Sequence, residues 1–122
     1  MAIDARRFPR VGIKAFAAVS ATGKADIYKE YNATCVNISE GGCCLQLDVL
    51  LSGADIDFGV TVGIELPDNK PRLIINGRIV WLKEFSHEKF TKYLVGIEFH
   101  NVKPEDKQRI IAFIHGQMGN SK

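Results

Sequence analysis

The chain has 122 residues, 46% of them hydrophobic, which fits one compact domain with a single core. The formal net charge is only +2, which argues against a protein that binds long nucleic acids. No apolar run approaches the roughly 18 residues of a membrane span, and the N-terminus lacks a secretory signal, so we expect a cytoplasmic protein that does not insert into membranes.

The chain begins with a short basic segment that precedes the first strand signal. Residues 1–10 are predicted to form a flexible arm rich in arginine, and residues 11–118 to form the folded domain. From residue 11 to residue 19 apolar side chains alternate with other residues, which is typical of a strand.

Strand signals then recur at short spacing, separated by glycine, proline, asparagine and aspartate. The charged stretch 83–92 is predicted to be a hairpin loop, and 48–59 a longer loop. Because no helix pattern is interleaved, the chain is predicted to be mainly all-β, a small antiparallel barrel. The further predicted strands cover residues 25–31, 33–38, 43–47, 60–66, 72–82 and 93–100.

One of these strands, 72–82, contains the only tryptophan, Trp81. Trp81 shares its parity with three apolar residues of the strand, so it is expected to fill the core. An alternative is a stacking surface for a base near a strand end. Gly77 interrupts the packing and indicates a bulge or the close approach of another backbone.

The last element changes to a helical period. Pro104 at the first position and two acidic residues in the first turn open a helix over about 104–116. Its apolar stripe is expected to pack against the barrel. Gly116 or Gly119 is expected to end it.

Catalytic and metal-binding patterns are not found. Cys35, Cys43 and Cys44 make an odd number without a metal-ligand spacing, so buried, unpaired thiols are expected. The three histidines are scattered, and no serine or cysteine lies in a nucleophile-elbow sequence. We therefore expect no metal site, no cofactor and no enzymatic activity.

The polar turn at residues 37–42 and the arginine arm offer the chemistry of an anion site. Gly41 and Gly42 permit positive φ angles and close backbone approach, while Asn37 and Ser39 can hydrogen-bond the local backbone or a ligand. Arginine guanidiniums bind phosphates in bidentate fashion and stack on flat rings. The alternative is an ordinary hairpin turn beside a solvated basic tail.

Both segments resemble the two signatures of the PilZ domain family. Arg-Arg-Phe-Pro-Arg at residues 6–10 matches the pattern of two arginines separated by three residues. Asn-Ile-Ser-Glu-Gly-Gly at 37–42 matches aspartate or asparagine, any residue, serine, two residues and glycine. Segments 77–81 and 95–99 and the helix opening at Pro104 also look like this family.

The resemblance implies a six-stranded antiparallel β-barrel with a C-terminal α-helix, and a receptor for the bacterial second messenger cyclic di-GMP. Arg6 and Arg10 would hold the phosphates and the Hoogsteen edges of the guanines, with Arg7 as a helper. Asn37 stands where many members have aspartate, and a neutral acceptor there can lower the affinity. The implied ligand-binding residues are Arg6, Arg7, Arg10, Asn37 and Ser39 by polar contacts, Gly42 by leaving room for the ligand, and, as weaker candidates, Gly41 and Trp81.

The leading functional hypothesis is a stand-alone receptor in which the ligand clamps the arm onto the barrel. The new surface would relay the signal to an unidentified effector protein, in motility or biofilm regulation, and the receptor would be a monomer or weak dimer. An alternative is a nucleotide-independent PilZ-like adaptor in motility or pilus assembly. A third, single-stranded nucleic-acid binding through the arm, is disfavoured because few aromatic residues accompany the arginines.

Overall fold

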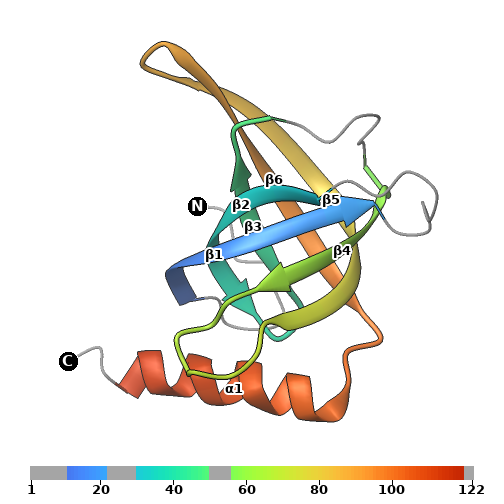
Figure 1. Ribbon diagram of the computed structural model, residues 1–122, viewed down its shortest axis with the longest axis vertical. Helices are drawn as coiled ribbons and strands as arrows, with labels where there is room; N and C mark the ends of the chain where they lie inside the picture. The colour runs from blue at the N-terminus through green and yellow to red at the C-terminus, as the bar shows by residue number, and fades with distance from the viewer. Residues whose placement is uncertain (1–10, 22–29, 50–55, 120–122) are drawn as a thin grey trace, which may run out of the picture.

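A computed structural model describes residues 11–21, 30–49 and 56–119, and the predicted arm at 1–10 lies outside them. The described strands form a closed antiparallel barrel in the order β1-β2-β3-β6-β5-β4 (Figure 1). This confirms the predicted barrel with a C-terminal helix. The elements are β1 Val11–Ala21, β2 Glu30–Ser39, β3 Gly42–Leu47, β4 Gly59–Ile64, β5 Leu73–His87, β6 Phe90–His100 and α1 Pro104–Gly119.

The core fills the barrel interior with the inward-facing aliphatic residues of all six strands. α1 crosses one end of the barrel (Figure 1) and adds Ile110 and Ile114 to this core. Cys35 and Cys43 belong to the same core, whereas Cys44 is buried without joining it. All three cysteines are buried and none forms a disulfide, as predicted.

The helix is also tied to the β4–β5 turn by a bidentate ion pair. Arg109 donates from Nε to Asp68 Oδ2 at 2.7 Å and from Nη2 to Asp68 Oδ1 at 2.9 Å. The hydrogen bond from Arg109 is the main cause that lowers the pKa of the Asp68 carboxyl. The side chain of Arg109 is only 13% exposed, so this pair holds the helix at a defined position on the barrel.

Bulges change which face the side chains occupy on two strands. On β2 the register shifts between Cys35 and Asn37, so Cys35 and Ile38 both reach the core. On β5 it shifts between Ile79 and Trp81, and Trp81 is 37% exposed. The prediction that Trp81 fills the core is therefore wrong, because the extra residue in the strand reverses its face.

Three predicted boundaries also differ from the structure. β2 runs unbroken from Glu30, so the predicted gap between strands 25–31 and 33–38 is wrong, while residues 25–29 lie outside the described chain. The stretch 83–92 is not a loop, because β5 and β6 continue into it and pair as far as His87 and Phe90. α1 extends past the approximate bound of 116 and ends at Gly119, the second of the two glycines that were expected to end it.

Candidate functional site

The β2–β3 turn is fixed by one buried hydroxyl. Ser39 is 4% exposed. Its Oγ accepts a hydrogen bond from the Gly41 N–H at 3.2 Å and donates to the Gly42 carbonyl at 3.3 Å. The Phe99 N–H also donates to the Gly41 carbonyl at 2.9 Å. The Ser39 hydroxyl therefore shapes the turn, and its hydrogen-bonding capacity is used by the protein itself.

Gly42 is required by the barrel for a separate reason. A Cβ atom at this position would lie 2.2 Å from the Ile97 carbonyl oxygen of the neighbouring strand β6. The backbones of β3 and β6 approach each other too closely here for any side chain. Gly42 was expected to leave room for a ligand, whereas a Cβ here would meet backbone atoms of Ile97 and Glu98.

One cross-strand row joins the predicted residue Asn37 to Trp81. Asn37 on β2 pairs with Cys44 on β3, Cys44 with Gly96 on β6, and Gly96 with Trp81 on β5. A Cβ atom at Gly96 would lie 2.2 Å from Trp81 Nε1, so the indole rests directly on this glycine. We call these four residues the Asn37–Trp81 row. In this row the Asn37 amide and the Trp81 ring lie on either side of Cys44 and Gly96.

A second row lies two residues along the strands and carries charge. Ser39 pairs with Gly42, Gly42 with Glu98, and Glu98 with Arg78. We call these four residues the Ser39–Arg78 row. Because Ser39 follows Asn37 by two residues, the two rows are neighbours on the sheet.

Glu98 is the centre of the charged part of this row. Its Oε1 atom accepts hydrogen bonds from Arg78 Nε at 3.0 Å and from His100 Nε2 at 3.1 Å. These bonds, the one from His100 first, lower the pKa of Glu98. The bond to Glu98 is also the main cause that raises the pKa of Arg78, which forms a second ion pair with Asp57. Glu98 is therefore held in its ionised form.

Sequence reasoning did not find Glu98 or Arg78 as site residues. The alternation in β6 is visible in the sequence and puts Glu98 on the outer face. Its position beside Gly42 depends on β3 pairing with β6, two strands separated by the whole of β4 and β5. A single sequence does not report that pairing.

The start of β1 pairs with the strand that carries the second predicted motif. Val11 pairs with Ile38 and Gly12 pairs with Asn37. Arg6, Arg7 and Arg10 lie outside the described residues. Arg10 is bonded to Val11, and successive Cα atoms are about 3.8 Å apart. The arm is therefore attached to the barrel beside the β2–β3 turn.

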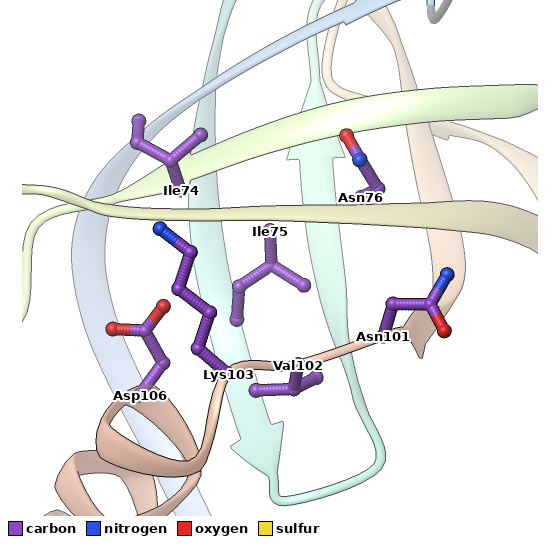
Figure 2. A pocket seen from close by; sticks show the side chains of 7 residues that line it. All are labelled: Ile74, Ile75, Asn76, Asn101, Val102, Lys103 and Asp106. Carbon is purple, nitrogen blue, oxygen red and sulfur yellow. The ribbon is translucent and has the colours of Figure 1, made fainter.

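A separate hollow of about 250 Å³ lies between β5 and the segment that leads into α1. Figure 2 shows Ile75 on its floor, with Asn76, Asn101 and Lys103 around it. These three polar residues are exposed, and none of the predicted site residues lines this hollow.

Two other kinds of site are absent from the described part of the chain. No helix there combines the length and apolar character needed to cross a bilayer. Within the same residues, no three histidine, cysteine, aspartate or glutamate side chains gather as a metal site would require.

The closed six-stranded barrel with a helix across one end defines the class of domain. The PilZ domain model matches residues 4–116, and the chain belongs to the PilZ domain family. No curated protein matches the sequence.

Several solved structures share this fold at low sequence identity. The PilZ domain of YcgR from Escherichia coli with c-di-GMP has a TM-score of 0.76 and 12% identity, over 97% of this chain and 95% of that one. The Bacillus subtilis inhibitor of motility, MotI/DgrA, has a TM-score of 0.76 and 17% identity, over 98% of this chain. The K. pneumonia MrkH–c-di-GMP complex has a TM-score of 0.76 and 16% identity, over 98% of this chain.

These proteins differ in length. The chain spans 54% of the Bacillus subtilis protein and 55% of MrkH. It corresponds to the barrel alone in the YcgR comparison.

Proposed function

We propose that this chain binds cyclic di-GMP between its arginine arm and the outer face of β2 and β3. The observation that carries the proposal is the register of β1, in which Gly12 pairs with Asn37. It begins the arm beside the turn that holds the second PilZ motif. This register supports the proposal that the two short motifs, far apart in the sequence, form one site.

The chemistry of the motifs suits a cyclic dinucleotide. The ligand carries two phosphates and two guanines, and a guanidinium serves both kinds of group. Guanine presents two acceptors, O6 and N7, for which arginine is the matching bidentate donor. In this proposal Arg6 and Arg10 supply most of the binding energy, and Arg7 assists them.

The described residues have two roles in this proposal, direct contact with the ligand and support of the turn. Asn37 lies partly exposed on the outer face and contacts the ligand directly. Ser39, Gly41 and Gly42 build the turn and fix the floor of the site, because their atoms are already engaged within the barrel. The exposure of Trp81, and its place in the same row as Asn37, favour a stacking role for its indole.

The output of binding is proposed to be a new surface that a protein partner recognises. Ordering of the arm by the ligand costs conformational entropy, which the arginine contacts must exceed. A segment that becomes ordered only in the bound state is a signal that a partner can read. In this role the chain acts as a receptor and carries out no reaction.

Isothermal titration with cyclic di-GMP tests the proposal. The wild-type chain is expected to bind, and Arg10→Ala is expected to bind roughly 10- to 100-fold more weakly, the cost of one lost bidentate contact. Lys14→Ala is the matched control, because Lys14 is an exposed cation four residues further along the chain. Absence of heat at high micromolar ligand, or equal binding by Arg10→Ala, would overturn the proposal.

A further inference from the structure

Glu98 is a carboxylate beside the proposed site that no motif includes. It pairs with Gly42, the last residue of the β2–β3 turn motif, and Gly42 has no side chain to separate it from the turn. The Glu98 side chain is 47% exposed. It can therefore meet a ligand that lies on the outer face of β2 and β3.

The hydrogen bonds that described residues donate to Glu98 all reach the same oxygen. Arg78 and His100 both donate to Oε1. No described residue donates a hydrogen bond to Oε2. The two donors come from β5 and from β6 itself, and they fix the position of Oε1.

A guanine needs an acceptor of this kind. Its Watson–Crick edge carries two donors, the N1–H and the N2 amino group, and an ionised carboxylate is a pure acceptor with two oxygens. The turn offers only neutral side chains on the sheet rows, the amide of Asn37 and the hydroxyl of Ser39. The Ser39 hydroxyl is already engaged within the turn.

We propose that Glu98 is a specificity residue that accepts hydrogen bonds from the N1–H and N2 amino group of one guanine. This inference rests on the proposed cyclic di-GMP function. Arginine would read the acceptor edge of the bases, and Glu98 would read the donor edge of one of them. Arg78 and His100 act as positioning residues, because they fix Oε1 and keep the carboxylate ionised.

Glu40 is the competing carboxylate, since it also belongs to the turn. It lies at the tip, between the paired residues Ser39 and Gly42, and so is not a member of either cross-strand row. The rows place Glu98 beside Arg78 and the Asn37–Trp81 row, where a base that stacks on Trp81 would lie. Glu40 is therefore the matched control.

The test compares cyclic di-GMP with its analogue in which both guanines are replaced by hypoxanthine, which lacks the N2 amino group. The wild type is expected to prefer the guanine ligand by roughly tenfold or more, the effect of losing one hydrogen bond to a charged acceptor. Glu98→Gln should lose most of this preference and bind cyclic di-GMP about tenfold more weakly. Glu40→Gln should keep both the affinity and the preference.

Two outcomes separate this inference from the proposed function. If the wild type binds no cyclic di-GMP, the proposed function itself fails. If the wild type binds but Glu98→Gln keeps its affinity and its guanine preference, or Glu40→Gln loses them instead, the assignment of Glu98 is overturned. Melting curves of both variants without ligand check that each is folded, and the comparison of two ligands on one variant cancels any loss of active protein.

Discussion

The two ends of the barrel hold their hairpins in different ways. At the end crossed by α1, the β2–β3 turn is held by Ser39 and the β4–β5 turn by the Arg109–Asp68 pair. At the other end the β5–β6 hairpin projects beyond the barrel (Figure 1), and Phe90 near its tip is 63% exposed. The candidate site lies at the anchored end, where the barrel fixes the positions of the residues that would meet the ligand.

The largest effect is expected at Gly42, where the backbones of β3 and β6 leave no room for a side chain. Gly42→Ala would place its Cβ 2.2 Å from the Ile97 carbonyl oxygen, and neither backbone can move away without breaking the sheet. We expect a loss of about 3 kcal/mol or more in the free energy of unfolding. Denaturant titration measures it.

Gly116→Ala is the control for that change. Gly116 lies inside α1 with nothing within 4 Å of its added Cβ, so alanine should raise stability by roughly 0.5–1 kcal/mol. A small effect of Gly42→Ala, similar to that of Gly116→Ala, would show that β3 and β6 do not constrain the turn.

The second change removes the hydroxyl that fixes the turn. Ser39→Ala leaves the Gly41 N–H without its acceptor, which should cost roughly 1–2 kcal/mol of stability. Ser86→Ala, at an exposed position in the β5–β6 hairpin, should change stability by less than about 0.5 kcal/mol. Equal losses of stability in the two variants would show that the β2–β3 turn is held no more firmly than the β5–β6 hairpin.

The third change concerns the anchor of α1 and has a pH signature. Arg109 lowers the pKa of Asp68, so the pair stabilises the fold above the ordinary aspartate value of 3.8. This stability is lost as the pH falls through the lowered pKa. Asp68→Asn should cost about 1 kcal/mol at pH 7.

The cost of Asp68→Asn should shrink as the pH falls from 3.8 toward the lowered pKa, at which the folded wild-type carboxylate becomes protonated. Thermal melting of both proteins across this range measures the difference. A gap between wild type and variant that widens in acid would show that the ion pair is not its cause.

The smallest effect is expected at the end of the barrel that carries the β5–β6 hairpin. Phe90 lies outside the core, with Lys92 Nζ 5.8 Å from the centre of its ring. Phe90→Ser should change stability by less than about 0.5 kcal/mol and leave ligand binding unaltered. Weaker cyclic di-GMP binding by this variant would place part of the site at the hairpin end.

Much of the fold is predictable because the barrel core repeats a simple pattern. Alternation over β1 and β6 and the change of period at Pro104 indicate the strands and the helix without any tertiary information. The prediction of a loop at 83–92 is wrong because this hairpin extends past the core. Its two faces both meet solvent, so no alternation marks the strands.

The error at Trp81 has a different physical cause. Alternation along a strand predicts the face of a side chain only where the strand has no bulge. The register shift after Ile79 turns Trp81 to the opposite face. The position of this bulge depends on how β5 pairs with β6, which a single sequence does not report. The site was predictable as two motifs, but the row that joins Asn37 to Trp81 required the pairing of β3 with β6.

The most direct test of the account is the fluorescence of Trp81, the only tryptophan, during titration with cyclic di-GMP. If a base stacks on the Asn37–Trp81 row, the emission should change in a saturable way, with the same dissociation constant that calorimetry gives. The change should be absent in Arg10→Ala at the same ligand concentrations. Calorimetric binding without any change in Trp81 emission would contradict the placement of the ligand on this row.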